Sequence, residues 1–267
     1  MKEWSKRKNY MPWTGALIGI IMAGIGIFLI SGYRLDRNFS VVKTGSIIVE
    51  VPEAGAKVYL DERKKYTTGK SDETVPFRSL SPGRYSIIVA KDGFWPWSKE
   101  VEVSANNVAR LRPFLIPTSI TGFTITEEDP EYEKIRSLVA ENSLPSAYDK
   151  KVSGDGLVAV WVEGKTLKGA WQGSEETVPK WFCSAAFCTP MIEILRSVEP
   201  IRSVSFYEQR NDVLVVTAGK NIFAIDISEN GKQNYQPIYS GTAPRSAESG
   251  SGTLFIQDNE TLIEISL

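Results

Sequence analysis

The stretch that decides the fold of this chain is SIIVEVPEAGAKVYLD, residues 46–61. Its first six residues are rich in β-branched side chains, and a Pro-Glu-Ala-Gly sequence at 52–55 interrupts them. Residues 56–61 then alternate apolar and polar side chains. A β-branched run and a period of two both predict strands, and proline and glycine between them predict a turn. The stretch therefore predicts a strand, a turn and a second strand.

The same pattern continues as far as residue 115. Short apolar runs recur about every ten residues and are separated by glycine and proline, which predicts a small antiparallel β-sandwich. Further strands are expected at 85–90, 98–103 and 108–115, turns at 80–84, 91–93 and 106–107, and a polar loop at 62–72.

Several of these turns and strands agree with a known domain family. The agreeing positions are Pro52, Gly55, Ala56, Val58, Tyr59, Asp61, Leu80, Pro82, Gly83, Tyr85, Val89, Lys91, Gly93 and Phe94. Over residues 44–117 the chain resembles the PEGA domain, named for a Pro-Glu-Gly-Ala signature, and departs from it by one extra residue at 52–56. The resemblance implies a β-sandwich that exported and surface-anchored bacterial proteins use as a spacer or interaction module. It implies no catalytic residues.

On the N-terminal side, residues 12–33 form a run without a charged side chain. As a helix this run extends about 33 Å, enough to cross a hydrocarbon core of about 30 Å. Four basic residues and one acidic residue precede it, whereas the charges that follow it nearly balance. This asymmetry predicts a single transmembrane helix over 12–33, a cytoplasmic stub at 1–11, a stalk at 34–43 and an extracytoplasmic remainder.

The competing interpretation of this segment is a cleaved secretory signal. A signal sequence needs small residues near its cleavage site, and Leu29 or Ile30 stands where one of them belongs. A retained anchor in the cell membrane is therefore favoured. Gly15, Gly19 and Ala23 recur every four residues, a spacing that lets two membrane helices approach, so this face is a candidate homodimer contact.

Beyond residue 117 the sequence predicts a helical connector at 118–149. Asp129 followed by proline is typical of a helix start, and apolar residues on one face then predict a helix over 130–142.

The remaining region, residues 150–267, is again β-rich. Three stretches share one plan of strand, tight turn and strand, at 156–172, 212–227 and 252–267. This plan is typical of the inner part of a propeller blade, and the stretch 201–241 is predicted to be one complete blade. Because three incomplete blades do not close a propeller, we expect a curved stack, a truncated propeller or half of a dimeric assembly.

The composition excludes several classes of function. The chain has 267 residues, a net charge of −1, two cysteines and no histidine. The balanced charge argues against a nucleic-acid binder, and the lack of histidine removes the commonest general base and metal ligand. No cofactor or metal site is expected. Cys183 and Cys188, with four residues between them, predict a local disulfide in an oxidising exterior.

Five aromatic residues are candidate contacts for a ligand or partner: Phe94, Trp95, Trp97, Trp161 and Trp171. For the cluster at 94–97, packing into the end of the sandwich core is the alternative.

Two classes of function remain. The first is a non-catalytic, membrane-anchored protein of the bacterial cell envelope, whose C-terminal β region binds a protein or a polysaccharide. The second is an exported hydrolase of envelope glycan that uses paired carboxylates, with Asp155, Glu163, Asp212 and Asp226 as candidates. Binding is favoured because nothing in the sequence fixes two of these acids at a set separation.

Overall fold

The computed structural model describes residues 11–30, 32–35, 40–142, 150–183, 188–228, 233–249 and 252–267. The chain is mainly β and divides into two units. The smaller unit contains residues 1–50, 74–85 and 101–112, and the larger contains 51–73, 86–100 and 113–267. Most of the predicted stub, the middle of the predicted stalk and the end of the predicted connector lie outside the described residues.

The smaller unit begins with α1 (Met11–Ile30), a helix of 20 residues. Among the described residues, no helix combines the length and the apolarity that crossing a bilayer requires. Next come β1 (Tyr33–Leu35) and β2 (Val41–Lys43), which pair antiparallel. Part of the predicted stalk is therefore β-structure.

A three-stranded sheet completes the smaller unit, in the order β6-β3-β9. Its strands are β6 (Glu73–Leu80), β3 (Gly45–Val51) and β9 (Val108–Leu111). β3 and β9 run parallel, so the prediction of a purely antiparallel sandwich was wrong for this pair. Alternation along a strand shows which face is buried, but it looks the same in both kinds of pairing. The sequence therefore could not distinguish them.

A four-stranded sheet, in the order β5-β4-β7-β8, belongs mostly to the larger unit. Its strands are β5 (Lys64–Thr67), β4 (Lys57–Leu60), β7 (Gly83–Ala90) and β8 (Trp97–Val103). The loop predicted at 62–72 was partly wrong, because β5 lies in it and forms an antiparallel hairpin with β4. β5 has the sequence KKYT, and lysines are common on edge strands because they discourage further pairing.

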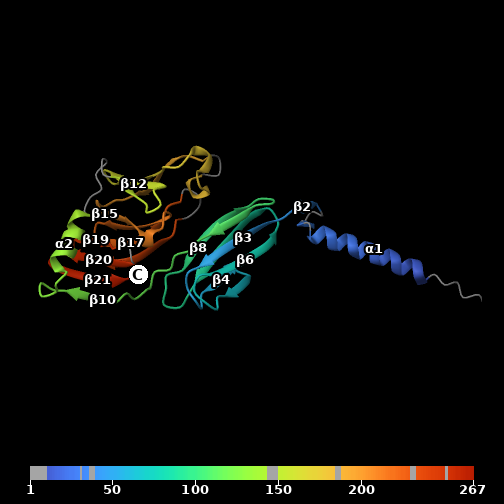
Figure 1. The fold of residues 1–267 in the computed structure, drawn as a ribbon, viewed down its shortest axis with the longest axis horizontal. Coiled ribbons are helices and arrows are strands. Elements are labelled where there is room, and N and C mark those ends of the chain that lie inside the picture. Colours follow the sequence, from blue (N-terminus) through green and yellow to red (C-terminus); the bar gives the residue numbers. More distant parts are fainter. Residues whose placement is uncertain are drawn as a thin grey trace, which may run out of the picture. The chain divides into compact units, whose positions relative to one another are not determined.

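Three four-stranded sheets, which we name the first, second and third blade sheets, form most of the rest of the larger unit (Figure 1). The first contains β11 (Lys151–Val152), β12 (Val158–Glu163), β13 (Thr166–Trp171) and β14 (Met191–Arg196). The second contains β15 (Ile201–Phe206), β16 (Val213–Ala218), β17 (Asn221–Asp226) and β18 (Tyr235–Ser240). The third has the order β10 (Gly122–Ile125), β21 (Thr261–Ser266), β20 (Thr253–Asp258) and β19 (Pro244–Glu248).

The three predicted hairpins are confirmed as β12–β13, β16–β17 and β20–β21. The complete blade predicted at 201–241 is confirmed as the sheet β15–β18. For the other two hairpins the prediction that they are incomplete was wrong, because each also lies at the centre of a four-stranded sheet. β10 comes from the predicted connector and pairs antiparallel with β21, so a strand early in the region completes the last sheet. Of the four residues of β10 only Ile125 is buried, and so weak a local pattern does not predict a strand.

The blade sheets pack on one another in two different ways. Apolar side chains of the first and second blade sheets share one core. The second and third meet at three buried hydroxyls, where Ser203 Oγ donates to Thr217 Oγ1 at 2.8 Å. Ser246 Oγ of the third blade sheet lies 3.1 Å from Ser203 Oγ and 2.8 Å from Thr217 Oγ1. Each buried hydroxyl therefore has the partner that burial requires.

The predicted helix is α2 (Tyr132–Glu141), which lies along the third blade sheet (Figure 1). Ile135 and Val139 pack there against Ala247 and its neighbours. Ala247 follows Ser246 in β19, and successive side chains of a strand point to opposite faces. α2 therefore covers the face that points away from the second blade sheet, where a further blade would pack.

The predicted start of this helix was wrong. Its N-cap residue is Glu131, and no side chain caps it. The Asp129 carboxylate instead accepts hydrogen bonds from the Thr126 backbone N–H at 2.7 Å and from the Thr126 hydroxyl at 3.0 Å. Acidic residues often bond nearby backbone in a turn, which competes with capping.

Because Ile135 is buried under the third blade sheet, Ile135→Ala should lower the free energy of unfolding by about 2–5 kcal/mol. Leu138→Ala is the matched control on the exposed side of the same helix, where the loss should stay under about 1 kcal/mol. Urea unfolding followed by circular dichroism measures both, and equal losses would contradict the covering role of α2.

Candidate functional site

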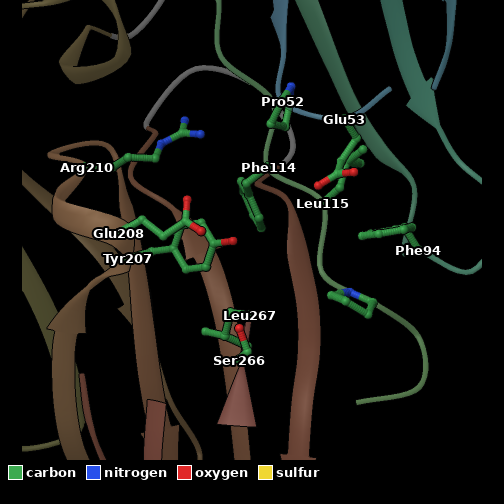
Figure 2. A pocket seen from close by; sticks show the side chains of 11 residues that line it. Pro52, Glu53, Phe94, Phe114, Leu115, Tyr207, Glu208, Arg210, Ser266 and Leu267 are labelled. Atoms are coloured by element: carbon green, nitrogen blue, oxygen red, sulfur yellow. The ribbon is translucent and has the colours of Figure 1, made fainter. Parts of the chain in front are cut away.

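A cavity of about 270 Å³ lies within the larger unit (Figure 2). One wall is formed by Pro52, Glu53, Phe94, Phe114, Leu115 and Pro117. The other is formed by Tyr207, Glu208, Arg210, Ser266 and Leu267. The cavity therefore combines aromatic rings, apolar side chains and two carboxylates.

The turn that carries Pro52 and Glu53 is held by hydrogen bonds to Thr68, which is 3% exposed. The Thr68 hydroxyl accepts a hydrogen bond from the Ala56 N–H at 2.9 Å and donates one to the Glu53 carbonyl at 2.8 Å. Gly55 has φ +75°, a left-handed conformation that glycine adopts without a steric penalty. The signature turn of the sequence thus holds Glu53 at the cavity.

Glu53 already binds a cation of the same chain. The Lys91 ammonium lies 2.6 Å from the Glu53 carboxylate and 4.5 Å from the centre of the Phe94 ring. A carboxylate and an aromatic face together thus hold one ammonium group at this wall.

Gln236 of β18 holds the segment that follows β9. Its amide donates to the Phe114 carbonyl at 3.1 Å and accepts from the Ile116 N–H at 2.7 Å. Gln236 is 1% exposed, so both bonds are shielded from water. Together the two bonds fix the backbone at residues 114–116, and so place Phe114 and Leu115 in the cavity wall.

The opposite wall is the short 3-10 helix η3 (Tyr207–Gln209), directly after β15. Glu208 has φ +46°, which is uncommon for a residue other than glycine. The Tyr207 ring is buried, and its centre lies 6.3 Å from that of Phe114. Burial, together with the charge of Glu208 and a hydrogen bond to it, raises the pKa of Tyr207, so the hydroxyl keeps its proton.

Arg210 has its guanidinium bonded inside the chain. It donates two hydrogen bonds of 2.8 Å to the Asp212 carboxylate and one of 3.1 Å to the Pro113 carbonyl. Such a bidentate pair offsets the arginine charge. Arg210 therefore fixes the cavity wall and adds little positive charge to it.

Glu248 of β19 lies behind Glu208. One oxygen of its carboxylate accepts the Glu208 N–H at 2.6 Å, while Oε2 is buried without a hydrogen-bond partner among the described residues. Burial, reinforced by the charge of Glu208, raises the pKa of Glu248 to about 7. Glu248 does not line the cavity.

A second set of polar contacts joins β8 to the second blade sheet. Lys99 and Asp226 form an ion pair of 2.8 Å whose side chains are 12% and 9% exposed. Asn234 donates to the same carboxylate at 3.2 Å and accepts the Ser98 N–H at 2.8 Å. The Asp226 charge is therefore buried with three donors around it, counting the Asn234 backbone N–H at 2.9 Å.

The predicted aromatic contacts do not form one surface. Phe94 lines the cavity, and Trp95, 37% exposed, follows it. Trp97 and Trp161 are 3% and 4% exposed, so their rings offer almost no surface to a partner. For Trp97 this is the core packing that the sequence left open as the alternative.

Trp171 belongs to a separate aromatic cluster next to the disulfide. Its ring centre lies 6.5 Å from that of Trp181, which lies 4.8 Å from that of Phe182. Cys183 and Cys188 are disulfide-bonded, as predicted.

Each of the four candidate acids has hydrogen-bonding partners of its own. Asp155 accepts from Ser153 and Asn211, Glu163 from Lys168 and Trp161, Asp212 from Arg210, and Asp226 from Lys99. Burial acts to raise the pKa of Asp155, but its hydrogen bonds outweigh burial and hold it low. The hydrogen bond from Lys168, followed by that from Trp161, lowers the pKa of Glu163. Of the four acids, Asp226 is buried.

A more open hollow of about 520 Å³ lies between β10, α2 and the β20–β21 turn, lined mainly by polar side chains. In the described part of the chain, no group of three or more acids or cysteines could hold a metal ion.

The residues that sequence reasoning missed are Tyr207, Glu208, Gln236 and Glu248. Each lies in an ordinary polar stretch, and each is brought to the site by contacts across many residues of sequence. No local pattern marks them.

Comparison with known proteins identifies one part of the chain. The PEGA domain model matches residues 44–117, and the chain therefore contains a PEGA domain, as the resemblance indicated. A comparison with curated proteins gave no match. The PEGA domain supplies the first wall of the cavity, and the blade sheets and their loops supply the second.

Because the Lys99–Asp226 pair is buried, Lys99→Met leaves an uncompensated carboxylate and should destabilise the protein by about 3–5 kcal/mol. Lys57→Met is the control, since Lys57 lies 3.6 Å from Asp92, whose side chain is 99% exposed. Its loss should stay within about 1 kcal/mol. Urea titration compares the two, and a similar small effect of both would show that the buried pair does not hold β8 to the second blade sheet.

A carboxyl with a higher pKa in the folded state binds its proton more tightly there, so ionisation opposes folding. The contribution of Glu248 to stability should therefore fall as the pH rises from 4.5 to about 7. Glu248→Gln keeps an acceptor for the Glu208 N–H and should gain about 1–2 kcal/mol at pH 8, after allowance for solvent screening. The exposed Glu260→Gln should change nothing. Denaturation at pH 5 and pH 8 measures this, and a pH-independent difference would refute it.

Proposed function

We propose that this chain is a non-catalytic, extracytoplasmic protein of the bacterial cell envelope that presents a binding module next to a membrane. The PEGA domain at residues 44–117 is the observation that carries this proposal, because that domain serves as a surface module. The three blade sheets follow it and form the larger part of the chain.

A membrane helix remains a prediction of the sequence, and we propose it as the point of attachment. Residues 12–33 carry no charged side chain, and four basic residues precede them. In α1, Leu17, Ile20 and Met22 are 64%, 72% and 65% exposed. Apolar side chains exposed along a helix need a cover, and lipid is the cover that their chemistry and the flanking charges favour.

We propose binding and no catalysis for the blade sheets. The four acids that a hydrolase could have used each have a hydrogen-bonding partner of their own. A general acid of a glycosidase needs a raised pKa and must face the substrate. Among the described residues, Glu248 has a raised pKa, but it faces the interior and not the cavity.

With the N-terminus inside, protease added to intact spheroplasts should degrade the region after Tyr33, because the basic flank holds residues 1–11 in the cytoplasm. An epitope at Leu267, followed by immunoblot, measures this. Exchange of the four basic residues Lys2, Lys6, Arg7 and Lys8 for glutamate is the control and should protect a fraction of the epitope. Complete protection of the unaltered chain would refute the topology.

A further inference from the structure

The cavity carries an excess of negative charge next to aromatic rings. Glu53 is paired with Lys91, and Arg210 with Asp212, so these four charges cancel. Glu208 forms no ion pair within the described parts of the chain, although it is exposed and lines the cavity. Its carboxylate bonds the Tyr207 hydroxyl, which leaves further acceptor capacity. One negative charge therefore remains for a ligand.

Figure 2 shows Tyr207 and Glu208 on one side of the cavity and Glu53 and Phe94 on the other. On the Glu53 side the ammonium of Lys91 lies between a carboxylate and a ring. On the Glu208 side the one cation of the lining is Arg210, which is paired with Asp212, so the Glu208 carboxylate has no ion-pair partner among the described residues. The pair at one wall shows that a carboxylate of this cavity binds an ammonium group, and Glu208 provides a second carboxylate at the other wall.

From this we infer that the cavity binds a primary ammonium group, namely a lysine side chain of a partner protein. A lysine has an apolar stem and a charged head. Pro52, Leu115 and Leu267 suit the stem, and the exposed Glu208 carboxylate suits the head. The inference deepens the proposed binding role and rests on it.

The charge of the cavity favours an ammonium group over an anion or an apolar group. An anion would meet Glu208, while the one nearby guanidinium of the lining is bonded to Asp212. A purely apolar group would desolvate the Glu208 carboxylate without giving it a partner, which costs free energy. An ammonium group supplies that partner.

Isothermal titration of the full chain in detergent, with Nα-acetyl-lysine methylamide as the probe, tests this assignment. We expect saturable binding, and at least about tenfold weaker binding of the norleucine analogue, which has the same stem without the ammonium. Equal affinity for both probes would overturn the inference, because the cavity would then recognise only the apolar stem. The absence of saturable binding of either probe would overturn it as well.

Variants distinguish a loss of the binding site from a general loss of folding. Glu208→Gln keeps its backbone bond to Glu248 and should weaken the lysine probe about fivefold or more, whereas Glu260→Gln, outside the cavity, should not. Lys91→Met frees Glu53 and Phe94 and should tighten binding several-fold, a gain that a misfolded protein cannot give. Unchanged or weaker binding in Lys91→Met would contradict the proposed charge balance. Surface exposure in spheroplasts is independent of these results, so failure here leaves the envelope location standing.

Discussion

An open stack of blade sheets has two end faces, and the need to cover both is the constraint on which the larger unit depends. In a closed propeller each blade covers the next, but three blade sheets leave the first and the last without a neighbour. At one end α2 covers the third blade sheet with Ile135 and Val139. Terminal units of stacked folds are commonly finished in this way, by an element with a polar outer side.

The other end face, on the first blade sheet, is covered by long charged side chains. On β12, Val158, Val160 and Val162 point into the shared core, so Trp161 lies on the opposite face, where Lys168 is its cross-strand partner. Lys168 in turn lies opposite Glu193 and bonds Glu163, and the Lys150 ammonium lies 4.6 Å from the Trp161 ring centre. Long polar side chains thus shield the tryptophan. Both end faces of the stack are therefore covered by parts of the same chain.

Sequence reasoning reached the central hairpins because each carries its own alternation and turn. It failed for strands whose pairing depends on distant residues, such as β10 on β21 and β9 on β3. The disulfide could be predicted because Cys183 and Cys188 are close in sequence and are the only two cysteines of the chain. The cavity could not be predicted, because Glu53 and Phe94 belong to the PEGA domain and Glu208 to the blade region. These residues are far apart in sequence and line the same cavity only in the folded chain.

Two costly features lie together at the cavity. Glu208 adopts φ +46°, and the carboxylate behind it, Glu248, buries an oxygen without a partner among the described residues. Each is unfavourable, the backbone conformation by about 1–3 kcal/mol. Neither is needed for the hairpins or for the packing of the sheets, which rest on apolar cores and buried hydroxyls. Both instead hold the Glu208 carboxylate outward, since its backbone N–H is tied to Glu248. Left-handed non-glycine residues also occur elsewhere, for example at Asp61 and Asn106, so it is the combination of the two features at Glu208, beside a cavity, that supports the proposed binding role of this residue.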